Sequence, residues 1–408
     1  MQFQAYTGDR PGEFPPHCDH DEDTDGDING ETECKDDINA DDGPGSNDDM
    51  IFDSEDNESD DSTTDEDMDE YSGSDSGYNS DRTDVTMTEN KNQYYTTEID
   101  GCRKPLRQNL DAAKPSEFEE TFGFKAWTSP LILIGGSDFH VTGASGAVID
   151  GNGPAWWDGQ GDNGVKKPNH FIQVKAAGTK ALIDNLTIKN YPAHCFTLGG
   201  SNLIIRNVHL DNSAGNAPNS LSGGKPAAHN SDGFNCKASN LLLEDISVIN
   251  QDDCVAVTGG GNVTVRRANC DGSHGLSIGS IGSDTTIKDV FFYDSIVKNS
   301  QQGARIKTVS GATNSLVQNI LYQNITVSNI SKFGIVVEQD YLNGGPSGVA
   351  TNGVKIQDVH FVQVTGTVAS GAKDYYILCG DGSCSDITFS GVKITGGSGD
   401  SCNFGKLC

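Results

Sequence analysis

The chain has 408 residues, of which 34% are hydrophobic and 21% charged, and its 59 acidic and 28 basic side chains give a formal net charge of −31. No run approaches the roughly 18 consecutive apolar residues that a membrane-spanning helix needs, which predicts a soluble protein that does not enter a membrane. A nucleic-acid binder is excluded as well, because neutralising phosphates requires clustered Lys and Arg.

The negative charge is concentrated in residues 1–100, which hold 33 acidic residues and only 4 Lys or Arg. A segment composed mostly of Asp, Glu, Ser, Thr, Asn and Gly cannot bury enough apolar surface to offset its chain entropy. We therefore predict a disordered, acidic, low-complexity tail over residues 1–100. Its first residues lack the basic and apolar regions of a secretory signal peptide. The remaining residues suffice for one large domain.

Eleven cysteines, most of them in the C-terminal half, suggest an oxidising compartment. Short-range spacing predicts three disulfides, with buried free thiols as the alternative reading. The three pairs are Cys254 with Cys270, Cys379 with Cys384, and Cys402 with Cys408. The odd total leaves at least one cysteine unpaired or paired between chains. Spacing leaves the partners of the other five open, namely Cys18, Cys34, Cys102, Cys195 and Cys236.

Short β-type runs recur along the domain, each with an Asn, Asp or Arg ahead of alternating apolar residues. They begin at Asn185, Asn207, Asp245, Arg267 and Asp289, at steps of 22, 38, 22 and 22 residues. A period in the low twenties indicates a solenoid. Helical periodicity is almost absent, and Gly and Asn separate the runs, so each repeat should consist of several short strands. The pattern predicts an all-β parallel β-helix, and the leucine signature of the alternative leucine-rich repeat is missing.

Ionisable side chains follow the same period. Asp232 and Asp253 are 21 residues apart, as are Asp253 and His274. Because each coil climbs by one strand spacing of about 4.8 Å, we expect the three groups to stack in one column. Arg305 and Lys307 would extend this column after one longer coil.

The column has the residue types of a glycosidic-bond hydrolase. Neighbouring carboxylates raise at least one pKa, so one group can donate a proton while another stays ionised. Asp252 and Asp253 would point to opposite faces of a regular strand, so both serve one site only where the strand ends or bends. Arg305 and Lys307 alternate correctly to share a face and could hold an anionic sugar.

Five motifs occur in a fixed order along this part of the chain. They are Asn230–Gly233, Asn250–Cys254, His274–Ser280, Arg305–Lys307 and Glu338–Tyr341. This set resembles the fungal endopolygalacturonases of glycoside hydrolase family 28, with further matches at 149–157 and 379–384. The resemblance covers 121–408 and implies a right-handed parallel β-helix, in agreement with the repeat. Residues 101–120 then form a degraded N-terminal cap or a linker.

The resemblance implies inverting hydrolysis of α-1,4 bonds inside polygalacturonate, the pectin backbone, with neither metal nor other cofactor. Asp252 would be the general acid, and Asp232 and Asp253 would activate the water. His274 would keep the acid protonated and oriented. The substrate-binding residues would be Asn230, Arg305, Lys307 and Tyr341.

The resemblance also implies a secreted, disulfide-bonded monomer, with a plant inhibitor protein as a further candidate partner. N-glycosylation sequons stand at Asn185, Asn262, Asn324 and Asn329. Two other functions remain open from the sequence. A catalytically silent β-helix could bind pectin or an inhibitor protein if the lost cap disables the cleft. A pectate lyase would instead need a calcium-binding carboxylate cluster and an arginine base, which the Asp, His, Arg and Lys set fits less well.

Overall fold

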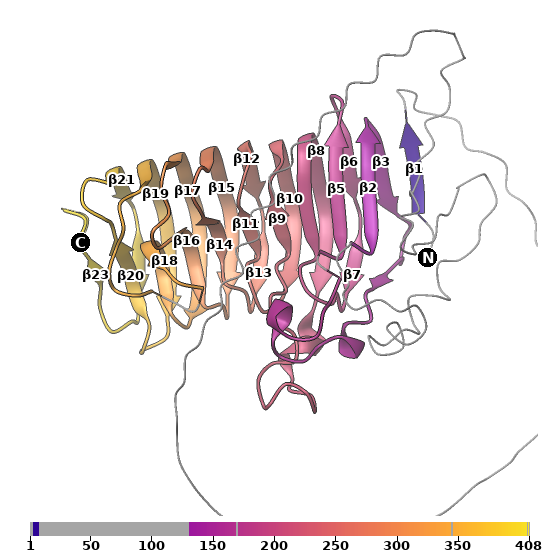
Figure 1. Ribbon diagram of the computed structural model, residues 1–408, viewed down its shortest axis with the longest axis horizontal. Helices are drawn as coiled ribbons and strands as arrows, with labels where there is room; N and C mark the ends of the chain where they lie inside the picture. Colours follow the sequence, from indigo (N-terminus) through magenta and orange to yellow (C-terminus); the bar gives the residue numbers. More distant parts are fainter. Residues whose placement is uncertain (1–2, 8–129, 169, 344–345, 406, 408) are drawn as a thin grey trace, which may run out of the picture. The chain divides into compact units, whose positions relative to one another are not determined.

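The computed structural model describes residues 3–7, 130–168, 170–343, 346–405 and 407, all within one compact unit. Strands from residue 132 onward form coils that stack in chain order along one axis, so the predicted parallel β-helix is confirmed (Figure 1). Within these ranges there is no α-helix, and therefore none that could cross a membrane.

Two parallel sheets form the walls of the coil. Sheet 1 contains β2 (Ile132–Ser137), β5 (Ile172–Ala177), the start of β8 (Phe196–Asp211), β9 (Phe234–Cys236), β11 (Val255–Val257), β14 (Leu276–Ile281), β16 (Gln302–Val309), β18 (Phe333–Tyr341), β20 (Lys373–Leu378) and β23 (Ser401–Cys402).

Sheet 2 contains the rest of β8 and the other strands. These are β1 (Phe3–Thr7), β3 (Phe139–Gly143), β4 (Ile149–Asp150), β6 (Ala181–Asp184), β7 (Thr187–Lys189), β10 (Ser239–Ile249), β12 (Gly261–Arg266), β13 (Asn269–Asp271), β15 (Thr286–Lys298), β17 (Ser315–Ile330), β19 (Val354–Val368), β21 (Cys384–Ser390) and β22 (Lys393–Thr395). Three short 3₁₀ helices, η2 (Gly153–Ala155), η3 (Gly161–Asn163) and η4 (Ser213–Asn216), lie in the connecting loops.

The recurring Asn, Asp and Arg residues are corners of the coil. Asn185, Asn207, Asp245 and Arg267 all adopt φ between 52° and 55°, the left-handed region. Asn and Asp tolerate this conformation better than other side chains with a Cβ atom. The sequence repeat is therefore a stereochemical signal, since a left-handed residue bends sheet 2 at the same place in successive coils.

The last step of the predicted repeat is wrong. Arg266 pairs with Tyr293, 27 residues on, which places Arg267 level with Asp294. Asp289 belongs instead to a second column of left-handed corners, level with Asn262, because Val263 pairs with Val290. Both columns have Asn or Asp in left-handed conformation, so the sequence pattern alone did not separate them.

The interior is filled by side chains that point inward from both sheets and stack from coil to coil. Phe292, Tyr322 and Phe361 are fully buried, and their ring centroids lie 4.6 and 5.2 Å apart. The Tyr322 hydroxyl donates a hydrogen bond to the carbonyl oxygen of Arg305 at 2.9 Å. This aromatic ladder therefore anchors the backbone of β16 from inside the coil.

Two of the predicted disulfides, Cys254–Cys270 and Cys379–Cys384, are confirmed. Cys402 is also disulfide-bonded, whereas Cys408 lies outside the described residues. Cys195 and Cys236 are buried free thiols. The first disulfide immediately follows Asp253 and links the two coils on which Asp253 and His274 lie.

Removing this disulfide should destabilise the fold. In Cys270→Ser, the loop between positions 16 residues apart is no longer closed, and we expect the free energy of unfolding to fall by about 2–4 kcal/mol. Urea unfolding without reductant measures the change. Cys384→Ser, which opens a disulfide with a separation of only 5 residues, is the control and should cost less. Equal falls in the free energy of unfolding of the two variants would contradict the explanation that the longer loop makes the first disulfide more stabilising.

Several predictions concern residues beyond the described part. The strand β1 pairs antiparallel with β3 and lies within the range predicted to be a tail. The rest of 1–100, the cap or linker at 101–120, and Cys18, Cys34 and Cys102 lie outside the described residues.

Asn185 donates a hydrogen bond from its side-chain amide to Oγ1 of Thr142 on the preceding coil at 3.3 Å, and the other three sequon asparagines join ladders of Asn and Asp side chains. The amides of Asn262, Asn324 and Asn329 donate to Asn240, Asp294 and Asn299 at 2.9, 2.7 and 3.0 Å. All three are exposed, and glycosylation there stays a prediction.

Candidate active site

The three groups of the predicted column lie just ahead of three adjacent strands of sheet 1. Val255 of β11 pairs with Phe234 on one side and Leu276 on the other, which puts Asp232, Asp253 and His274 on successive coils. Because β11 starts only at Val255, Asp252 and Asp253 belong to a turn, where consecutive side chains can serve one site. The expected stacking is confirmed.

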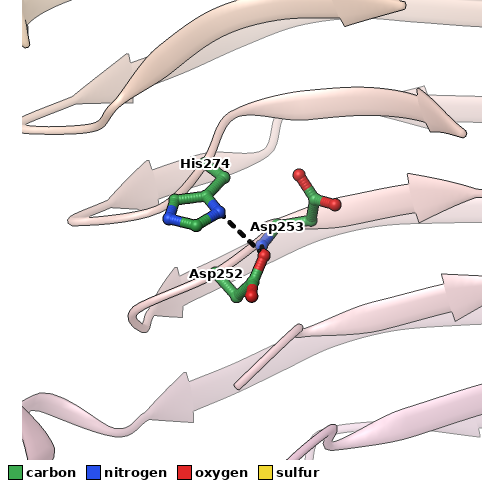
Figure 2. Close-up of side chains that lie close together, drawn as sticks. All are labelled: Asp252, Asp253 and His274. Carbon is green, nitrogen blue, oxygen red and sulfur yellow. Dashed lines mark hydrogen bonds and ion pairs between the residues drawn. The ribbon is translucent and has the colours of Figure 1, made fainter. Parts of the chain in front are cut away.

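Asp252 forms an ion pair with His274. The Nδ1 atom of His274 lies 2.8 Å from Oδ1 of Asp252, and the imidazole approaches from the next coil (Figure 2). The other carboxylate oxygen of Asp252 accepts a hydrogen bond from Nδ2 of Asn230 at 3.2 Å. Both oxygens of this buried carboxylate are therefore oriented by the protein.

Asp253 points in a different direction and is held by other partners (Figure 2). Ser277 donates a hydrogen bond to its Oδ1 at 2.6 Å, and Nζ of Lys307 lies 2.9 Å from its Oδ2. Arg305 approaches Oδ1 to 3.9 Å and donates two hydrogen bonds to Oε1 of Glu338 at 3.0 and 3.2 Å. Two buried cations thus face two buried carboxylates.

The expectation that Arg305 and Lys307 extend the Asp253 and His274 column is wrong in register. Arg305 pairs with Ser277, three residues beyond His274, so both cations lie further along sheet 1. Their long side chains still reach the site. The Tyr341 ring, from the end of β18, lies 5.2 Å from the Arg305 guanidinium and 5.1 Å from the Lys307 ammonium.

Two further residues contact the site without having been predicted from the sequence. The Nδ1 atom of His194 lies 3.1 Å from Oδ1 of Asp232, and its Nε2 lies 2.9 Å from Oδ2 of Asp162. Asp162 lies on η3, in a loop outside the 21-residue period, so no spacing signal could have indicated it. Glu338 begins the motif Glu338–Tyr341, but its hydrogen bonds with Arg305 were not predicted.

These groups border a cleft of about 520 Å³. Its lining includes His274, Arg305, Glu338 and Tyr341. Its lining also includes three further basic side chains, those of Lys225, His229 and Lys332. The cleft therefore combines the imidazole of the Asp252 and His274 pair with several basic side chains, a combination that suits an anionic polymer.

In the free protein, the pKa values of Asp232 and Asp252 are shifted in opposite directions. Burial raises the pKa of Asp232, and the neighbouring Asp252 and Asp253 raise it further, so that it stays above the ordinary value despite His194. Burial also raises the pKa of Asp252, but His274, Lys307 and His194 lower it more, and the net pKa is well below the ordinary value. Burial lowers the pKa of His274, yet Asp252 outweighs it and raises the net pKa. In the free protein the proton of the Asp252 and His274 pair therefore resides on the imidazole.

The ligand-type atoms of Asp252, Asp253 and His274 lie within 4.8 Å of one another, close enough to be considered as a metal site. Their lone pairs are already engaged, because His274 faces Asp252 while Ser277 and Lys307 occupy Asp253. A divalent cation would have to displace the Lys307 ammonium from 2.9 Å. This donor set fits proton transfer better than cation binding.

Together these features define a parallel β-helix protein with a carboxylate and imidazole site beside two buried cations. Residues 95–406 match the glycosyl hydrolases family 28, and the chain belongs to this family.

A probable endopolygalacturonase D of Neosartorya fischeri is 59% identical over 278 residues, covering 67% of this chain and 58% of that protein. A polygalacturonase of Fusarium fujikuroi is 55% identical over 322 residues, covering 75% and 86%. Among solved structures, endopolygalacturonase I from Stereum purpureum, in complex with two galacturonate, aligns with a TM-score of 0.60 and 31% identity over 68% of this chain and 80% of that chain. The chain thus spans little more than half the length of the Neosartorya relative.

Proposed function

We propose that this protein hydrolyses internal α-1,4-galacturonosyl bonds of polygalacturonate. The observation that carries the proposal is that His274, which pairs with Asp252, lines the same cleft as Arg305, which lies beside Lys307 at Asp253. The names of its relatives support the same substrate.

Substrate binding rests on the two cations. The side chains of Arg305 and Lys307 are only 5% and 7% exposed and cannot move freely, so a sugar carboxylate would meet positions that are already fixed. The Tyr341 ring packs beside both cations and restricts their orientation further. Lys225 and Lys332 would attract neighbouring galacturonates along the cleft.

In the proposed reaction, Asp252 donates a proton to the glycosidic oxygen as the bond to the anomeric carbon breaks. A water molecule attacks this carbon from the opposite face and loses a proton to Asp232 or Asp253, which inverts the configuration. His274 orients Asp252 and holds the proton of the pair before the substrate arrives.

The free protein has its proton on the imidazole side of this pair, so substrate must shift it towards Asp252. Lys307 is one cause of the low Asp252 pKa. A galacturonate carboxylate bound to Lys307 adds one negative charge that offsets the field of this cation at Asp252, which raises the pKa of Asp252. Substrate binding thereby favours the protonated acid.

The test uses the purified full-length protein with polygalacturonate at mildly acidic pH. We expect viscosity to fall well ahead of the rise in reducing ends, because internal cuts shorten long chains first. Proton NMR of the earliest products should show the inverted β-anomer. Release of monomers without early loss of viscosity would contradict endo action. Binding without any product would instead favour the catalytically silent β-helix.

We also propose secretion, which would provide the oxidising compartment for the disulfides. A monomeric state and a plant inhibitor protein as partner stay predictions.

A further inference from the structure

The loop at 158–167 is held in place by a buried ion pair. The Nζ atom of Lys167 lies 2.9 Å from Oδ1 of Asp158 and donates to the carbonyl oxygen of Gly161 at 2.8 Å. Both charged side chains are at most 3% exposed. The second oxygen of Asp158 accepts a hydrogen bond from the amide of Val165 at 2.7 Å. These contacts tie both ends of the loop together and fix η3 between them.

From η3, Asp162 reaches both reacting carboxyls through one intermediate each. Its carboxylate contacts Nε2 of His194 at 2.9 Å, and Nδ1 of the same ring contacts Asp232 at 3.1 Å. Its backbone amide donates to Oδ1 of Asn230 at 3.2 Å, and Nδ2 of Asn230 donates to Asp252 at 3.2 Å. Neither Asp162 nor His194 is among the residues that line the cleft.

The groups around His194 favour its charged form. Asp162 and Asp232 face its two ring nitrogens and favour a proton on each. The side-chain nitrogen of Asn235, 3.0 Å from Nδ1, is itself a donor and opposes a proton on that atom. Burial lowers the pKa of His194, but Asp232 and Asp162 raise it more, to well above its ordinary value.

Other charged groups lie near this pair. The ring of His170 is 5.1 Å from that of His194, and burial together with the His194 charge lowers the pKa of His170 to about 4, so His170 stays neutral. The charge of Lys167 lowers the pKa of Asp162, and that of Lys237 lowers the pKa of His170. The charge of His194 lowers the pKa of Asp252. Of the charged groups near His194, only the carboxylates of Asp162 and Asp232 contact its ring directly within the described residues.

We propose that His194, held by Asp162, is a positioning residue that keeps Asp232 ionised and oriented to accept the proton of the attacking water. This inference rests on the proposed function and deepens it by assigning the support of the base. His194 donates one N–H to each carboxylate, so its ring orientation is fixed from both sides, and its charge opposes the burial of Asp232. The loop at 158–167 thus positions the base through His194.

The test compares Asp162→Asn and His194→Gln with the unmodified chain in pH profiles of kcat and KM. Loss of either charge removes support for ionised Asp232, whose pKa rises, so the acidic limb should move to higher pH. We expect a shift of about one pH unit and a fall in kcat of about tenfold below the optimum, with KM unchanged.

The matched control is Asp358→Asn. Asp358 is 45% exposed and lies 2.8 Å from Nε2 of His360, whereas Asp162 is 46% exposed and lies 2.9 Å from its histidine. This variant should leave the profile unchanged. An unshifted limb in Asp162→Asn, or a raised KM with normal kcat, would overturn the proposal. The exposed position of Asp162 keeps the test valid if His194→Gln does not fold.

A second readout does not depend on activity. In histidine side-chain NMR, His194 should stay doubly protonated above pH 7 in the unmodified chain and titrate at lower pH in Asp162→Asn. Identical titration in both proteins would overturn the inference. An unmodified chain without hydrolytic activity but with this difference would contradict only the proposed function.

Discussion

Asp252→Asn is expected to lower kcat on polygalacturonate by roughly 10²- to 10⁴-fold, because the amide cannot deliver a proton to the leaving oxygen. Asparagine keeps the size of the side chain; its carbonyl oxygen can accept from Asn230, and its amide can donate to His274 once the imidazole has lost its proton. Circular dichroism and the unfolding midpoint should therefore stay close to those of the unmodified protein. Reducing-end assays under saturating substrate measure the loss.

A comparison with Asp232→Asn distinguishes the acid from the base. This matters because the free protein has the higher pKa on Asp232 and the lower one on Asp252. On a galacturonate oligomer with an activated aryl leaving group, protonation is no longer needed, so Asp252→Asn should recover much of its activity. Asp232→Asn should stay impaired on both substrates. The reverse pattern would make Asp232 the proton donor and refute the assignment of Asp252.

Lys307→Met is expected to destabilise the fold as well as to abolish substrate binding. It leaves the buried carboxylate of Asp253 without the ammonium at 2.9 Å, with both side chains at most 7% exposed. Breaking a buried ion pair by removing one partner typically costs about 3–5 kcal/mol, because the remaining charge is uncompensated. Urea unfolding at neutral pH measures this loss.

The control for this variant is Lys298→Met. Lys298 lies 3.4 Å from Asp271, and their side chains are 40% and 30% exposed, so water screens the pair. Its loss should cost under about 1 kcal/mol. Similar falls in the free energy of unfolding of the two variants would show that burial does not determine how much the Asp253 and Lys307 pair stabilises the fold.

The parallel β-helix could be predicted because its signals are local. A left-handed corner selects Asn or Asp at one position in each coil, and Asn185, Asn207 and Asp245 report it directly. Two successive coils of 21 residues then bring Asp232, Asp253 and His274 level without any knowledge of loops. The disulfide between Cys254 and Cys270 joins adjacent coils and could be predicted because the two cysteines are only 16 residues apart.

Prediction failed where coil length changes. The register step is 22 residues from β10 to β12 but 27 from β12 to β15 and 30 from β15 to β17, so a fixed period assigns the wrong partners. Asp289 was placed in the wrong corner column for this reason. Arg305 and Lys307 were found by motif and alternation, yet their level along sheet 1 follows from the pairing of Arg305 with Ser277.

The sequence by itself determined the coil, the column of carboxylates and the cations, because each depends on residue type and short spacing. Only the tertiary structure decided that His274 pairs with Asp252, that Lys307 pairs with Asp253, and that His194 and Asp162 support Asp232. These contacts form between side chains from different coils and from a loop. Their partners, and the opposite pKa shifts of Asp232 and Asp252, depend on distances and burial that exist only once the coils have stacked.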